Sequence, residues 1–154
     1  MVEMSWCKKT RNGLQLIEPN KNMSDSYMMM AKESLDLIKN VSASKIWKAS
    51  ISYYAMYYSL YSVMMKIGVK CEIHACSLEF MKKMLKTLYS PEEIELIDLA
   101  FNLRNKLQYY PGQLIKDSQI EKISQDAIDF FVRSNEIISF IKESEIKEIR
   151  KLLN

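Results

Sequence analysis

The part of the sequence that decides the fold is residues 44–68, which read SKIWKASISYYAMYYSLYSVMMKIG. Apolar and aromatic side chains fall on nearly every side of a helix built from it: Ile46, Trp47, Ile51, Tyr53, Tyr54, Tyr57, Tyr58, Leu60, Tyr61, Met64 and Met65. Such a helix is typical of the centre of a bundle, because every face must be covered. Small residues recur every three or four positions, at Ser52, Ala55, Ser59 and Ser62. They let a neighbouring helix approach closely, and Gly68 stands where a helix C-cap is expected.

Composition also favours helices. The chain of 154 residues has only three glycines and three prolines but eleven methionines. All-β and doubly wound folds need many more turn residues, whereas methionine fills irregular helical cores. We therefore predict an all-α fold, an up-and-down bundle of about five helices. It forms one domain over residues 1–154, with an N-terminal arm at 1–22 that contains a short extended piece.

Capping signals and apolar spacing place the other helices around this central one. They predict helices at about 24–39, 75–88, 90–109 and 118–141. Capping boxes at Ser90–Glu93 and Ser118–Glu121 mark the starts of the helices at 90–109 and 118–141. Pro111 ends the first of these two helices near Tyr109. The tail at 142–154 alternates acidic and basic residues. That pattern predicts that the last helix continues into solvent.

Charge, cysteine and histidine content limit the classes of protein. The net charge of +3 includes no long basic block, so it permits weak phosphate affinity without indicating a nucleic-acid-binding protein. The three cysteines Cys7, Cys71 and Cys76 lack a Cys-x-x-Cys pair, which suits free thiols in a reducing cytoplasm. No segment has the pattern of a signal peptide or a membrane span. With His74 as the single histidine, we expect no metal and no cofactor, and a capping or structural role for His74.

The candidate functional residues lie in the run RNKLQYYPG at 104–112. On a helical wheel one broad apolar arc is formed by Ile94, Ile97, Ala100, Phe101, Leu103 and Leu107, and Arg104 falls inside it. A guanidinium there needs a partner. The partner is either a carboxylate such as Asp126 or Glu136, or a phosphate, or a second copy of the same surface.

Several short motifs follow one another along the chain. They are Trp6-Cys7 and Glu18-Pro19-Asn20 in the arm, Tyr27, Ala31 and Leu35 in the first helix, residues 52–58 (SYYAMYY), Gly68 followed by His74, and Arg104-Asn105. In this order they resemble the HEPN domain (higher eukaryotes and prokaryotes nucleotide-binding), an all-helical family. The likeness is greatest to its small stand-alone archaeal and bacterial members and covers essentially the whole chain.

The resemblance implies a function and a set of site residues. Many HEPN proteins are metal-independent RNases in which two subunits line one cleft, and many are toxins encoded beside a small nucleotidyltransferase. Their motif is an arginine, often followed by a polar residue, with a histidine four to six positions after the arginine. Arg104 and Asn105 match its first part, whereas Gln108, Tyr109 and Tyr110 fill the histidine positions, with Tyr109 as the nearest equivalent. The resemblance therefore implies a homodimeric component of a HEPN/nucleotidyltransferase toxin–antitoxin-type pair that binds nucleotide or RNA.

The missing histidine bears on catalysis. Metal-free RNA cleavage needs a base for the 2′-hydroxyl, an acid for the leaving oxygen and a cation on the phosphate. Tyrosine, with an unperturbed pKa of about 10, donates hydrogen bonds or stacks but is a poor base. We therefore predict weak or no RNase activity. The catalytic candidates are Arg104, Asn105 and Tyr109, and Tyr110 joins them in ligand binding.

Two alternatives stay open. One is an active metal-independent RNase that uses Arg104 across a dimer, and the other is a purely structural homodimeric interaction module. Geometry enters as well, because in an unbroken helix Arg104 and Tyr109 point roughly 140° apart. We expect the two side chains to meet only if the helix unwinds before Pro111 or if the partner subunit supplies one of them. Packing of Tyr109 and Tyr110 in the core or in a dimer interface is the competing interpretation.

Overall fold

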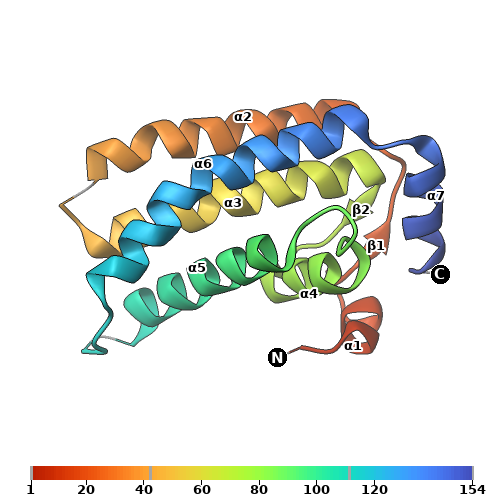
Figure 1. Ribbon diagram of the computed structural model, residues 1–154. Coiled ribbons are helices and arrows are strands. Elements are labelled where there is room, and N and C mark those ends of the chain that lie inside the picture. The colour runs from red at the N-terminus through yellow and green to blue at the C-terminus, as the bar shows by residue number, and fades with distance from the viewer. Residues whose placement is uncertain (1, 42, 111, 154) are drawn as a thin grey trace.

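The computed structural model describes residues 2–41, 43–110 and 112–153. The described chain is all-α, as the sequence predicts (Figure 1). Its α-helices are α1 (Met4–Lys9), α2 (Lys21–Ile38), α3 (Lys45–Ile67), α4 (His74–Met84), α5 (Pro91–Tyr109), α6 (Asp117–Phe140) and α7 (Glu143–Lys151), with a 3-10 turn, η1 (Lys39–Val41), after α2. No helix in these ranges combines the length and the apolar character needed to cross a membrane.

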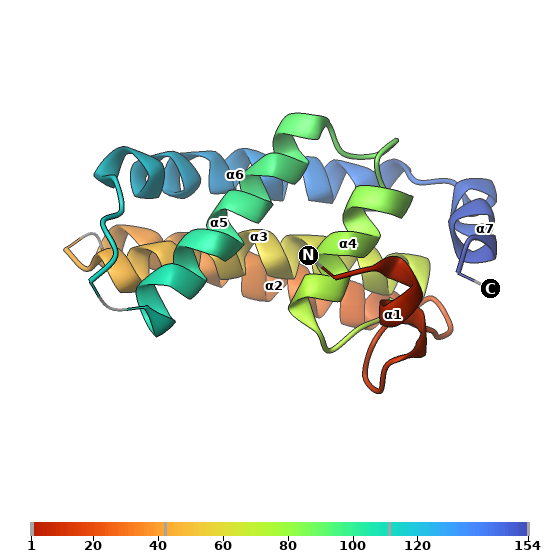
Figure 2. The same ribbon diagram turned by 90° about the horizontal axis from the view of Figure 1, so that it is seen from below.

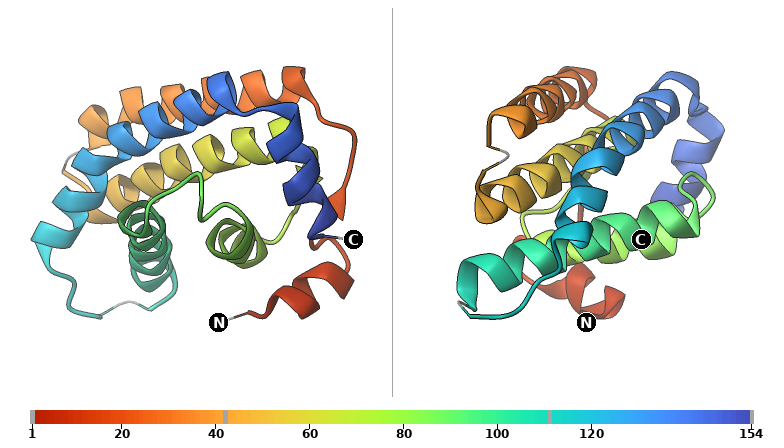
Figure 3. Two further views of the ribbon diagram at one scale, coloured as in Figure 1. Left: turned by 45° about the vertical axis from the view of Figure 1, so that its right-hand side comes forward. Right: turned by 60° about the vertical axis from the view of Figure 1, so that its left-hand side comes forward.

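Helix α3 is the central element, because its neighbours bury most of its residues, although Ile46 and Trp47 in its first turn are exposed. Helices α2 and α6 lie along it on one side, and α4 and α5 lie side by side on the other (Figures 1 and 3). Figure 2, seen from below, shows α5 crossing under α3 and α6. The small residues Ser52, Ala55, Ser59 and Ser62 are all fully buried. Ser62 donates a hydrogen bond of 2.6 Å to the carbonyl oxygen of Ser24, so α2 approaches closely at this stripe.

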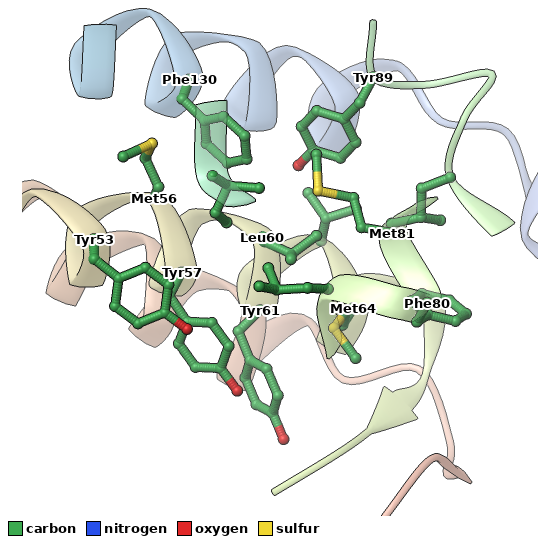
Figure 4. Close-up of a cluster of buried hydrophobic side chains, with 14 of the residues drawn as sticks. Tyr53, Met56, Tyr57, Leu60, Tyr61, Met64, Phe80, Met81, Tyr89 and Phe130 are labelled. Carbon is green, nitrogen blue, oxygen red and sulfur yellow. The ribbon is translucent and has the colours of Figure 1, made fainter. Parts of the chain in front are cut away.

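The core is built around α3 and contains many aromatic rings. Leu60 and Met64 of α3 pack with side chains that reach in from α4, α6 and the loop after α4 (Figure 4). Phe130 of α6 and Tyr89 are stacked, with ring centroids 5.3 Å apart. The buried hydroxyl of Tyr89 lies 2.8 Å from the Ser134 hydroxyl. Because its polar atom has a partner, this tyrosine can lie wholly inside the core.

The helix ends follow their capping signals in most cases. Ser44 caps α3 by accepting from the Trp47 amide, and the box of Ser90 and Glu93 is formed at the start of α5. The predicted Ser118–Glu121 box is not formed. Helix α6 begins one residue earlier, at Asp117, so Ser118 already lies within its first turn.

Gly68 ends α3 as predicted. Its φ angle of 84° lies in the left-handed region, where glycine is favoured. A Cβ atom there would also lie 2.6 Å from the carbonyl oxygen of Ile17 and would collide with the side chain of Arg150. The position therefore needs glycine both for its backbone conformation and for close packing.

The N-terminal arm is tied to the bundle in two ways. The strand β1 (Gln15–Leu16) pairs in antiparallel fashion with β2 (Val69–Lys70), so the extended piece joins the arm to the segment after α3. A disulfide joins Cys7 of α1 to Cys76 of α4, while Cys71 is free and buried. The expectation of three free thiols is therefore wrong for two of them. The packing of α1 on α4 brings together cysteines that lie 69 residues apart.

The predicted extension of the last helix into solvent is also wrong. Helix α6 ends at Phe140, and the next two residues, Ile141 and Lys142, are extended. The chain then turns into α7, which packs back on the end of the bundle (Figure 1). Ile149 is buried there, and Arg150 donates to the carbonyl oxygens of Ile17, Ile67 and Gly68 at 2.7, 3.0 and 2.8 Å. Ile149 and Arg150 therefore hold α7 against the bundle, although its charge pattern predicts a helix surrounded by solvent.

Candidate functional site

Arg104 lies in the last turns of α5, with its half-buried side chain directed at α3. Its Nη1 donates to the Asn105 Oδ1 at 2.9 Å, and its Nη2 donates to the Tyr54 hydroxyl at 3.1 Å. Its Nε is fully buried and has no hydrogen-bond partner in the described part of the chain. Neutral groups thus hold the guanidinium and leave part of its hydrogen-bonding capacity unused.

Aromatic rings surround the same guanidinium. Its Cζ lies 5.7 Å from the ring centroid of Tyr53, 5.5 Å from that of Tyr54 and 6.0 Å from that of Tyr109. Ring faces attract a cation, at about 0.5–2 kcal/mol for each favourable contact. They do not neutralise the charge, so the guanidinium remains able to attract an anion.

The carboxylate alternative for Arg104 is wrong. Asp126 pairs with Lys122, and Glu136 lies 3.6 Å from Arg133. Among the described residues, no acidic side chain comes within 4.0 Å of Arg104. A half-buried cation without a counter-charge is costly unless a ligand or a second molecule supplies one.

The tyrosine pair at the end of α5 is exposed. Tyr109 is 64% exposed and Tyr110 60%, which excludes core packing within this chain. Helix α5 stays helical through Tyr109, yet the Tyr109 ring still reaches the guanidinium of Arg104. The expectation that the two meet only through unwinding or a second subunit is therefore wrong. Both side chains are long, and in a helix the later one leans back toward the N-terminus.

His74 comes to the same place from another helix. It is the first residue of α4, and its Nδ1 lies 2.7 Å from the Tyr53 hydroxyl. Its ring stacks on Tyr57 with centroids 3.9 Å apart and meets the Tyr54 ring edge-on at 6.0 Å. The N-cap of α4 is Ile73, so His74 is not a capping residue. Figure 4 shows how Tyr53 and Tyr57 project their hydroxyl groups from the same side of α3.

The second nitrogen of His74, Nε2, is not the one that Tyr53 binds. It makes no hydrogen bond within the described chain, and Arg104 Nε is the one enclosed side-chain polar atom there without a partner. Burial, and secondarily the charge of Arg104, lower the pKa of His74 from 6.5 to about 4, so its imidazole is neutral at physiological pH. Burial raises the pKa of Tyr53 far above its ordinary value, which keeps its hydroxyl protonated.

We call Arg104, Asn105, Tyr109, Tyr53, Tyr54 and His74 the Arg104 cluster. The structure brings together three of the four residues singled out from sequence, whereas Tyr110, which follows Tyr109, is not one of the hydrogen-bond or ring partners of Arg104 in the described chain. Gln108, a second residue at the motif histidine positions, is instead tied to α3 through a 3.1 Å hydrogen bond to Ser50. In the described residues, no group of three histidine, cysteine or acidic side chains is placed to hold a metal ion.

The sequence reasoning missed His74 and the tyrosines of α3 as parts of this site. One signal was present, because Tyr53, Tyr54 and Tyr57 are spaced so that they share a side of α3. The side of α3 against which α4 and α5 pack is decided by tertiary contacts. A search against models of protein families gives no match for this chain, and a search of curated proteins gives none either.

Proposed function

We propose that the Arg104 cluster binds a phosphate group of RNA or of a nucleotide. The observation that carries the proposal is the half-buried guanidinium of Arg104, which has no carboxylate within reach in the described chain. Guanidinium groups bind phosphate oxygens through charge-assisted hydrogen bonds. A bound phosphate would supply the missing negative charge at this position.

Neighbouring residues fit the same ligand. The Oδ1 of Asn105 accepts from Arg104, and its amide NH2 group, which has no partner among the described residues, can donate to a phosphate oxygen. The exposed ring of Tyr109 offers a surface on which a base can stack, and Tyr110 offers a second ring beside it. The site thus combines one contact for a phosphate with aromatic contacts for a base.

The test is RNA binding by fluorescence anisotropy with a labelled single-stranded oligonucleotide. Arg104→Ala should weaken binding at least about tenfold, since a charge-assisted contact is worth about 1.5–3 kcal/mol. Arg11→Ala is the matched control, because it removes the same charge from an exposed position in the arm. Binding should also weaken as salt rises. Equal binding by Arg104→Ala and the native protein would rule the proposal out.

We further propose that the protein acts as a homodimer whose two-fold axis passes near the Arg104 cluster. Tyr109 of the cluster, its chain neighbour Tyr110 and Leu114 in the segment after α5 are exposed, with Leu114 completely so, and a second copy would cover them. Light scattering should give twice the 18.1 kDa mass of the chain. Leu114→Glu should shift the mass toward that of the monomer. A monomeric native protein at micromolar concentration would contradict this assembly.

The order of HEPN-like motifs supports a wider role as one component of a HEPN/nucleotidyltransferase pair. The protein would then associate with a small nucleotidyltransferase encoded beside it. Co-expression of the two genes with a tag on one product tests this, and we expect the untagged product to co-purify. If RNA and nucleotide binding are both absent while the dimer persists, a structural interaction module explains the protein better.

A further inference from the structure

A cavity of about 350 Å³ lies between α4 and α5. We propose that it binds a primary ammonium group carried on a short apolar body, with the carboxylate of Glu79 as the counter-charge. Of the described residues that line the cavity, none belongs to the Arg104 cluster. The proposal therefore concerns a second site and does not depend on phosphate binding.

The two helices turn one side each toward the cavity. Glu79 and Lys82 of α4 stand three positions apart, as do Asp98 and Phe101 of α5, so each pair shares a side of its helix. The ion pair of Lys82 with Asp98, at 2.5 Å, joins the two helices at the cavity wall. The cavity is thus a feature of how α4 and α5 pack together.

Glu79 is the observation that carries the proposal, because it is only 6% exposed and lines the cavity. Among the described residues its carboxylate takes part in no ion pair and no hydrogen bond. Lys82, one turn further along α4, is paired with Asp98 instead. A buried carboxylate without a partner is costly, and a cation seated in the cavity would supply the missing counter-charge.

The charges at the cavity favour an organic cation over an anion or a metal ion. Two carboxylates, Glu79 and Asp98, and one ammonium group, Lys82, give a net charge of −1, which repels a phosphate. Calcium takes about 6–8 oxygen ligands, whereas the described part of the chain has no group of three histidine, cysteine or acidic side chains placed to hold a metal ion. An ammonium group has only three donors to satisfy, and Glu79 with the amide oxygen of Asn102 offers acceptors for them.

The other walls of the cavity fit an apolar body attached to the ammonium group. Leu78 is buried there, and Phe101 is held by packing against Tyr53, with ring centroids 5.6 Å apart. An aromatic ring also attracts an ammonium group. The volume lies at the small end of the range of ligand pockets, about 300–1,000 Å³, so the ligand group is the size of a single ring or a short aliphatic chain.

The experiment is an NMR titration of the isotope-labelled protein with benzylamine and with benzyl alcohol. The two probes share one ring, and only benzylamine carries a charge at neutral pH. Benzylamine should bind with a Kd of about 1 mM or lower and shift the backbone amide signals of Glu79 and Asp98. Benzyl alcohol should bind at least about tenfold more weakly.

Glu79→Gln removes the charge and keeps the size of the side chain, so it should weaken benzylamine binding at least about tenfold. Glu95→Gln is the matched control, because Glu95 is exposed on α5 and does not line the cavity. It should bind benzylamine with native affinity. Ala75→Leu narrows the cavity and leaves its charges in place, and it should weaken binding to a similar extent if Glu79→Gln does not fold. Circular dichroism confirms the fold of each variant.

The stability of Glu79→Gln without ligand is a second readout. The melting temperature should rise by about 2 °C or more, because the substitution removes a buried charge that has no partner among the described residues. Glu95→Gln should leave it within about 1 °C of the native value. A lower melting temperature for Glu79→Gln would mean that the chain itself supplies a cation to this carboxylate, and it would overturn the proposal.

Two further probes separate the sources of such a group. n-Butylamine and Nα-acetyllysine N-methylamide carry the same ammonium group on the same four-carbon chain. Binding of n-butylamine alone assigns a free amine, and equal binding of both assigns a lysine side chain of a partner protein. Either result supports a site for a primary ammonium group.

Three results would overturn the proposal: no binding of benzylamine at about 10 mM, equal binding of benzylamine and benzyl alcohol, or equal binding of benzylamine by Glu79→Gln and the native protein. Arg104→Ala should bind benzylamine with native affinity, and Glu79→Gln should bind RNA as the native protein does. The failure of one proposed site therefore leaves the other standing.

Discussion

Arg104 and Arg150 lie in two regions of the molecule and show two ways of holding a half-buried arginine. Neither has a carboxylate within 4.0 Å among the described residues. Arg150 of α7 donates to three backbone carbonyl oxygens where α3 ends and the arm passes. Arg104 of α5 meets one amide oxygen, one hydroxyl and three aromatic rings, and its Nε is unsatisfied.

The difference separates a structural arginine from a candidate binding arginine. Carbonyl oxygens at a helix C-terminus carry partial negative charge, so Arg150 is well compensated by the fold itself. Hydroxyl groups and rings compensate Arg104 only in part. We expect substitutions where α7 and the N-terminal arm pack around Arg150 to change stability, and substitutions in the Arg104 cluster to change ligand binding.

The largest effect on stability should come from reducing the disulfide, which ties the N-terminal arm to α4. Cys7 and Cys76 are separated by 69 residues, and closing a loop of that length stabilises a protein by about 4 kcal/mol. Urea titrations with and without a reductant measure the change. A thiol assay on the unreduced, unfolded protein should detect Cys71 alone. Three reactive thiols in that assay would contradict the pairing.

Arg150→Ala should lower the free energy of unfolding by about 3 kcal/mol, because it leaves carbonyl oxygens without their charged donor. The matched control, Lys147→Ala, removes a charge from an exposed position of the same helix and should cost less than about 0.5 kcal/mol. Urea unfolding of both variants gives the two values. Similar losses would mean that Arg150 acts by charge alone and would weaken the contrast with Arg104.

Acid should destabilise the protein through His74 by about 2 kcal/mol after allowance for its partial exposure. The pKa of His74 is lowered from 6.5 to about 4, so the unfolded chain takes up its proton first. The contribution of His74 to stability should therefore be constant above pH 6.5 and fall as the pH drops from 6.5 toward 4. Denaturation curves across this range, compared with those of His74→Asn, measure the contribution. A variant with the same slope as the native protein would contradict the lowered pKa.

The smallest effect on stability should come from Arg104→Ala, at about 1 kcal/mol or less, because the substitution also removes a buried nitrogen that lacks a partner. Urea unfolding measures this value, and the anisotropy assay on the same sample measures RNA affinity. We expect a large loss of affinity with a small loss of stability. The reverse result would place Arg104 with Arg150, as a structural residue.

The sequence was enough to predict the helices because a helix is specified by residues that lie close together along the chain. The all-round apolar pattern of 44–67 identified the buried central helix, and Gly68 and the box at Ser90 marked helix ends from short-range signals. The prediction for the tail at 142–154 was wrong because it too used only local signals. Its charge pattern is that of a solvated helix, and nothing local showed that Arg150 would find carbonyl oxygens more than 80 residues away.

The sequence by itself determined a helical bundle with an arginine on the inner side of its α5 helix. The tertiary structure alone decided what surrounds that arginine. It placed His74 and the tyrosines of α3 beside Arg104, left every described carboxylate out of reach, and joined Cys7 to Cys76. The physical reason is that the periodicity of each helix fixes which side is buried, whereas the partner of that side depends on how all the helices pack together.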